Sequence, residues 1–72
     1  MGAKIKAFPN GTIQVDLNGL RLYSEIVNGL KHVECVSYDE KTDSYTLESV
    51  HSEKFKPLFI ALHNYKVENN IQ

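Results

Sequence analysis

Apolar and polar residues alternate along most of the first fifty positions of the chain. In VDLNGLRLY, residues 15–23, two short alternating runs flank Asn18-Gly19. Alternation is typical of a strand with one buried face, and Asn-Gly favours a two-residue type I′ turn because both positions adopt positive φ. The pattern predicts a β-hairpin that pairs Leu17 with Leu20, Asp16 with Arg21, and Val15 with Leu22.

Two further turns extend the same pattern in both directions. Pro9 and Gly11 in FPNG suit a three-residue hairpin loop, and Asn28-Gly29 in VNGL suits another two-residue turn. They predict the pairs Ala7–Ile13, Ile5–Val15, Lys4–Asp16, Val27–Leu30, Ser24–Val33 and Leu22–Cys35. The polar loop YDEKTDS contains no Asn-Gly, so its register is chosen to keep apolar residues together, with Tyr38 opposite Ser44, Ser37 opposite Tyr45 and Cys35 opposite Leu47.

These registers predict five antiparallel strands with one apolar face. Its central row is Ile5, Val15, Leu22, Cys35 and Leu47, flanked by the rows Ala7, Ile13, Ser24, Val33, Ser49 and Ala3, Leu17, Leu20, Ser37, Tyr45. The opposite face is expected to carry Lys4, Lys6, Gln14, Asp16, Arg21, Tyr23, Glu34, Val36, Thr46 and Glu48. A sheet with one apolar face needs a covering element.

The segment 52–69, SEKFKPLFIALHNYKVEN, is predicted to be that cover. Its apolar residues recur at helical spacing, namely Phe55, Leu58, Phe59, Leu62 and Tyr65. Ser52 is a candidate N-cap, although Pro57 is tolerated only in a first turn and moves the expected start of the regular helix toward Lys56. The alternative makes residues 57–62 a buried strand. We expect an α+β fold, an antiparallel β-meander of about five strands with a C-terminal helix packed on one face.

Composition narrows the class of protein. The chain has 72 residues, 42% of them apolar, and a formal charge of −1, which fits one small globular domain over residues 1–72. The single cysteine, Cys35, cannot form an internal disulfide, so a reducing cytoplasm, bacterial or phage-infected, is the expected location. No apolar run is long enough to span a membrane, and we expect no membrane partner.

The residue types that carry catalysis or bind metals do not converge in the predicted sheet. His32 and Cys35 have a zinc-like spacing, but strand alternation places them on opposite faces. Cys35 is therefore expected in the core rather than as a nucleophile. The sequence predicts a protein that is not an enzyme and holds no metal or cofactor.

The polar face of the sheet is the expected functional surface. Arg21, Tyr23, Val36 and Tyr38 are predicted to form a partner-binding patch, because Tyr and Arg are enriched at protein interfaces. A protein partner is favoured, and this partner could be a second copy of the chain that pairs through an open sheet edge as a homodimer. The alternative is single-stranded nucleic acid, held by stacking on the tyrosines and by basic side chains.

One segment resembles a known family. Residues 38–71 contain a Tyr-Asp-Glu-x-Thr-Asp loop, then an aromatic-Lys-Pro, then Glu-Asn; the matching residues are Tyr38, Asp39, Glu40, Thr42, Asp43, Phe55, Lys56, Pro57, Glu68, Asn69 and Ile71. This half of the chain is similar to the phage uracil-DNA glycosylase inhibitors. The resemblance implies a compact inhibitor that binds another protein, and it implies a strand over residues 57–62.

Overall fold

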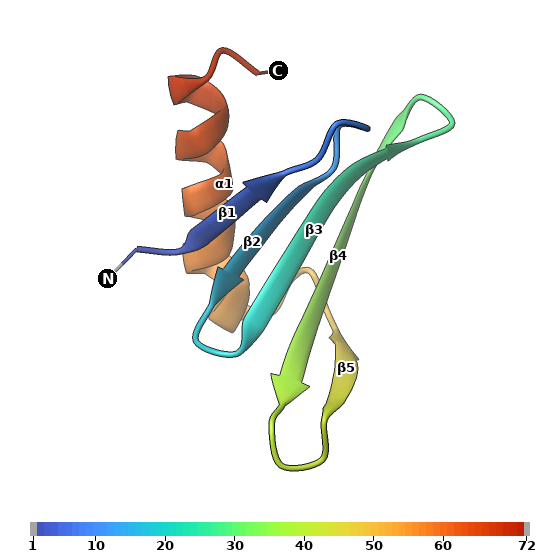
Figure 1. Cartoon of the computed structure of the whole chain (residues 1–72), viewed down its shortest axis with the longest axis vertical. Helices are drawn as coiled ribbons and strands as arrows, with labels where there is room; N and C mark the ends of the chain where they lie inside the picture. The colour runs from blue at the N-terminus through green and yellow to red at the C-terminus, as the bar shows by residue number, and fades with distance from the viewer. Residues whose placement is uncertain (1, 72) are drawn as a thin grey trace.

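The chain forms one five-stranded antiparallel sheet and one helix. The computed structural model describes residues 2–71. The strands are β1 (Lys4–Ala7), β2 (Ile13–Leu17), β3 (Leu20–Val27), β4 (Leu30–Asp39) and β5 (Ser44–Glu48), and they are ordered β1-β2-β3-β4-β5 (Figure 1). A short 3-10 turn, η1 (Glu53–Phe55), leads into α1 (Lys56–Glu68). The predicted α+β meander is confirmed.

Local turn chemistry sets the register of the first four strands. Asn18 and Gly19 have φ values of 49° and 77°, and Asn28 and Gly29 have 53° and 80°, which is the positive-φ pair of a type I′ turn. In the first loop the Phe8 N–H donates to the Thr12 carbonyl at 2.8 Å. All the predicted pairs among β1 to β4 are present, from Lys4–Asp16 to Val27–Leu30.

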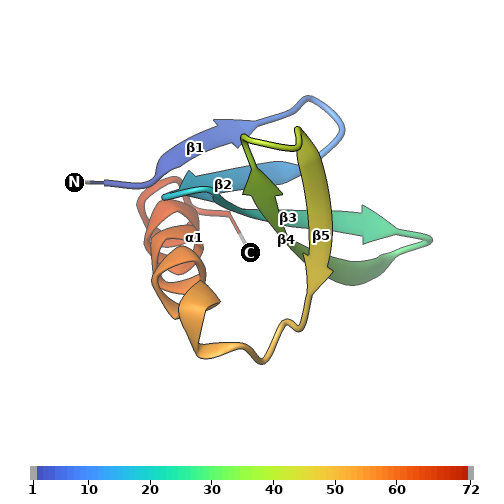
Figure 2. The same cartoon turned by 90° about the horizontal axis from the view of Figure 1, so that it is seen from below.

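The helix covers one face of the sheet. Figure 2 shows α1 on one side of the sheet, and its main contacts with strands are those with β2 and β3. Pro57 lies in the first turn, as expected, but the Ser52 side chain makes no capping hydrogen bond. The strand over residues 57–62, the alternative that the resemblance also implied, is wrong. The shared core consists of Ile13, Val15, Leu22, Cys35, Phe55, Leu58 and Leu62.

The register between β4 and β5 differs from the predicted one by a single residue. Asp39 pairs with Ser44, and so the following pairs are Tyr38–Tyr45, Ser37–Thr46, Val36–Leu47 and Cys35–Glu48. Because side chains alternate along a strand, this shift moves Tyr45 and Leu47 from the helix side to the outer face. Leu47 is 71% exposed there instead of lying in the apolar row.

Polar contacts on the helix side and an aromatic contact on the outer face accompany the observed register. On the helix side, the Ser37 hydroxyl donates to Glu48 at 2.8 Å, and Glu48 also pairs with Lys54 at 3.2 Å. On the outer face, the Tyr38 and Tyr45 rings lie 4.9 Å apart. Asp43 closes the loop at a φ of 51°, a conformation that Asp adopts more readily than most residues. The predicted register would bury little of Leu47, because α1 does not extend over β5 (Figure 2).

Candidate functional site

Arg21, on β3, lies at the centre of a polar cluster on the outer face of the sheet. The type I′ turn at Asn18-Gly19 brings Asp16 directly opposite it, and the Arg21 Nε donates to the Asp16 Oδ1 at 2.6 Å. Gln14 also donates to the Asp16 carboxylate, at 2.9 Å. The hydrogen bond to Asp16 is the main reason that the pKa of Arg21 is raised above its ordinary value. A pair this exposed adds only about 0.2–1 kcal/mol of stability, so its main effect is to position the guanidinium.

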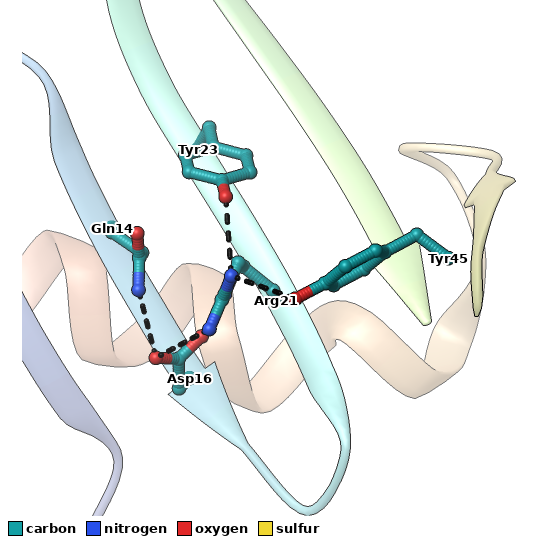
Figure 3. Close-up of polar contacts among 5 residues, drawn as sticks. All are labelled: Gln14, Asp16, Arg21, Tyr23 and Tyr45. Atoms are coloured by element: carbon teal, nitrogen blue, oxygen red, sulfur yellow. Dashed lines mark hydrogen bonds and ion pairs between the residues drawn. The ribbon is translucent and has the colours of Figure 1, made fainter. Parts of the chain in front are cut away.

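Two tyrosines hold the other end of the guanidinium group. The Arg21 Nη1 donates to the Tyr23 hydroxyl at 3.2 Å and to the Tyr45 hydroxyl at 3.4 Å (Figure 3). The Arg21 Cζ also lies 5.9 Å from the Tyr23 ring centroid and 5.7 Å from that of Tyr45. These distances allow cation–π attraction in addition to the hydrogen bonds. Arg21 therefore links β2, β3 and β5 through side chains alone.

A third tyrosine extends the aromatic surface toward the β4–β5 loop. Tyr38 lies opposite Tyr45, and its hydroxyl donates to Asp43 at 2.6 Å. That hydrogen bond raises the pKa of the Tyr38 phenol above its ordinary value. Tyr45 is 55% exposed, and Leu47 follows it on the same face of the strand. Together Arg21, Tyr23, Tyr38, Tyr45 and Leu47 form what we call the tyrosine–arginine surface.

A shallow pocket of about 340 Å³ opens in this surface beside the β2–β3 turn. Its lining includes Lys4, Leu17, Leu20, Arg21, Tyr38 and Tyr45. The Tyr38 N–H donates to the Gly19 carbonyl at 2.8 Å, which ties the turn to β4 and shapes the pocket wall. Aromatic rings, aliphatic side chains and one lysine suit a side chain or short segment of another molecule.

The structure brings together three of the four residues predicted to bind a partner. Arg21, Tyr23 and Tyr38 lie on the outer face, whereas Val36 is only 7% exposed and offers almost no surface. Val36 is flanked in the sheet by Arg21 and Leu47, which are its register partners. Tyr45 and Leu47 were missed, because the predicted register placed them on the helix side. Aligning Tyr38 with Tyr45 as an aromatic cross-strand pair would have found both.

The residue types associated with metal binding stay apart in the part of the chain that the structure describes. Cys35 is buried on the helix side, and burial raises the pKa of its thiol. His32 is exposed on β4, where it lies opposite Glu25 of β3 in the strand register. Within residues 2–71, no three His, Cys, Asp or Glu side chains converge on a common point.

Comparisons of this chain with protein-family models, with curated proteins and with solved structures found no match. Among residues 2–71, α1 is too short and too polar to cross a membrane.

Proposed function

We propose that this protein is a small protein-binding module and that it binds its partner through the tyrosine–arginine surface. The observation that carries the proposal is the single guanidinium that holds Tyr23 and Tyr45 in place while it is itself held by Asp16. Tyrosine and arginine supply a disproportionate share of binding energy at protein interfaces.

Preorganisation strengthens this assignment. Fixing a rotamer-rich side chain on binding costs about 0.5–1.5 kcal/mol, and Arg21 is already fixed before any partner arrives. Tyr45 and Leu47 remain 55% and 71% exposed, so their apolar area is available for burial. A rigid aromatic platform with exposed apolar neighbours is the composition expected of an interface centre.

The charges on this face favour protein over single-stranded nucleic acid. Arg21 is the only arginine of the chain, and its charge is compensated by Asp16 at 2.6 Å. A phosphate would have to displace that carboxylate. Asp43, which accepts the Tyr38 hydroxyl, adds a further negative charge beside the rings. Affinity for nucleic acid depends on uncompensated cations. In the lining of the pocket, Lys4 is the one cation besides Arg21.

The experiment is affinity capture from a bacterial lysate with the wild-type chain and two matched variants. Tyr45→Ala removes a ring that is 55% exposed on the surface, and Ile60→Ala removes a side chain that is 54% exposed on α1. We expect a captured protein to be retained by wild type and Ile60→Ala but lost with Tyr45→Ala. With that partner purified, Tyr45→Ala should weaken the Kd by about 30-fold, as expected for an interface hot spot.

Two results would contradict the assignment. One is capture that is equal for Tyr45→Ala and wild type, which would place the interface elsewhere. The other is salt-sensitive binding of a labelled single-stranded oligonucleotide that Tyr45→Ala abolishes, which would assign the same surface to nucleic acid.

We further propose that binding inhibits the partner, in line with the resemblance of residues 38–71 to the phage inhibitors. Occupying a surface that the partner uses for its own activity is the simplest effect of a small binding module. Assaying the captured protein's own activity with increasing amounts of wild type tests this, with Tyr45→Ala as the inactive control. Full activity at saturation would remove the inhibitory role but leave the binding role intact.

A further inference from the structure

Two lysines approach one another on the helix side of the sheet, far from the tyrosine–arginine surface. Lys31 on β4 and Lys66 on α1 line the same shallow cavity of about 220 Å³. The rest of its lining is largely apolar and includes Ile13, Ser24, Ile26 and Ile71. Within residues 2–71, the close ion pairs are Arg21–Asp16 and Lys54–Glu48, so neither cavity lysine is paired with a carboxylate.

The end of the helix fixes part of this cavity. Asn70 has a φ of 56°, and the Ile71 N–H donates back to the Lys66 carbonyl at 2.8 Å. This is the hydrogen bond of a Schellman motif, and it places Ile71 beside Lys66 at the cavity rim. The partial negative charge of the helix C-terminus explains why cations gather here, but it is too small to neutralise two of them.

The charged groups around the cavity come from three elements. Lys31 comes from β4 and Lys66 from α1, and Glu25 of β3 also contributes to the lining. Strand alternation puts the Glu25 side chain on the face of Tyr23, away from Ser24 and Ile26. Among residues 2–71, Lys31 and Lys66 therefore share the cavity lining without an ion pair to a carboxylate. The neighbouring Lys31 lowers the pKa of Lys66 to about 8.

We propose that this cavity binds a small organic anion, with its carboxylate or phosphate between Lys31 and Lys66 and its apolar part against Ile26 and Ile71. An oxyanion would relieve the repulsion between the two ammonium groups and accept hydrogen bonds from both. The exposed apolar side chains, Ile26 at 58% and Ile71 at 40%, would be covered by the ligand. This site is independent of the proposed function.

The test is an NMR amide-shift titration of the whole chain at constant ionic strength. The probes are inorganic phosphate, acetate and hexanoate. We expect saturable shifts at the amides of Ser24, Ile26, Lys31 and Ile71, with hexanoate binding more tightly than acetate by about fourfold for each methylene buried. Comparing the affinities for hexanoate and phosphate shows whether the site prefers a carboxylate or a phosphate.

Three glutamine variants show whether the lysines form the site. Lys31→Gln and Lys66→Gln should each weaken binding at least about tenfold, the loss expected for one charge-assisted hydrogen bond. Lys56→Gln, at the opposite end of α1, should leave it unchanged, as should Tyr45→Ala on the other face. Binding should also be weaker at about pH 9.5 than at about pH 6.5, because Lys66 loses its proton near pH 8, whereas an ordinary lysine keeps it to about 10.4.

Shifts that stay linear with concentration, or that Lys31→Gln and Lys56→Gln change equally, would overturn the proposal. Such a result would mean that the two lysines interact only with the partial negative charge of the helix C-terminus. The partner-binding assignment would be unaffected, because the tyrosine–arginine surface lies on the opposite face of the sheet.

Discussion

Replacing Leu22 and Leu47 separately by alanine tests the β4–β5 register. Both leucines belong to one apolar row in the alignment expected from the sequence, but in the structure Leu22 is fully buried and Leu47 is 71% exposed. Leu→Ala in a packed core costs about 2.7–5.0 kcal/mol, from lost burial and from the cavity left behind. Substitutions at exposed sites stay within about 0.5 kcal/mol. We expect about 3–4 kcal/mol for Leu22→Ala and at most about 0.5 kcal/mol for Leu47→Ala.

The size of the protein makes this difference easy to measure. At roughly 0.05–0.15 kcal/mol per residue, a chain of 72 residues has a total stability of about 4–11 kcal/mol. Leu22→Ala therefore removes a large share of it. With a urea m-value of about 1 kcal/mol/M for so small a domain, its unfolding midpoint should fall by about 3 M, or the variant should be unfolded without urea.

The assay is urea unfolding followed by far-ultraviolet circular dichroism, since the chain contains no tryptophan. Ile60→Ala, at 54% exposure on α1, is the matched control for a surface apolar residue. If Leu47→Ala proves as destabilising as Leu22→Ala, the Val36–Leu47 pairing is wrong and Tyr45 does not belong to the tyrosine–arginine surface.

Three further predictions concern other features of the fold. Hydrogen bonds from Ser37 and Lys54 lower the pKa of Glu48 below its ordinary value of 4.5. The ionised carboxylate therefore stabilises the fold above pH 4.5, and this contribution is lost as the pH falls through the lowered pKa. Glu48→Gln should lose less stability than wild type in acid denaturation, and an unchanged acid profile would refute the role of Glu48. Gly19→Ala should cost about 1–2 kcal/mol in thermal unfolding because φ there is +77°, whereas Gly2→Ala should cost almost nothing. Cys35 is 1% exposed, and burial raises the pKa of its thiol. We expect it to react with a thiol reagent only as fast as the chain unfolds. Rapid labelling of the folded protein would show that Cys35 does not lie in the core.

The tyrosine–arginine surface depends partly on contacts within one hairpin and partly on a residue far away in the sequence. Asp16, Arg21 and Tyr23 lie within one hairpin, and its Asn-Gly turn was enough to predict that they share a face. Tyr45 reaches Arg21 from 24 positions away, so its place depends on how β5 aligns with β4. Val36 was predicted on the correct face of the sheet, but it is buried there instead of exposed. The alternation of residues along a strand indicates which face a side chain is on, but it does not show whether larger neighbours cover that side chain.

The sequence by itself determined the hairpins joining β1 to β4, because each of these turns depends on residues such as Gly19 and Gly29 that accept positive φ at little cost. It also determined α1, since apolar residues at helical spacing follow a proline that fits only the first turn. Tertiary structure decided the alignment of β5. The β4–β5 loop has no Asn-Gly turn to dictate its length, and α1 does not extend over β5 (Figure 2). The Ser37–Glu48 hydrogen bond and the Tyr38–Tyr45 contact set the register instead.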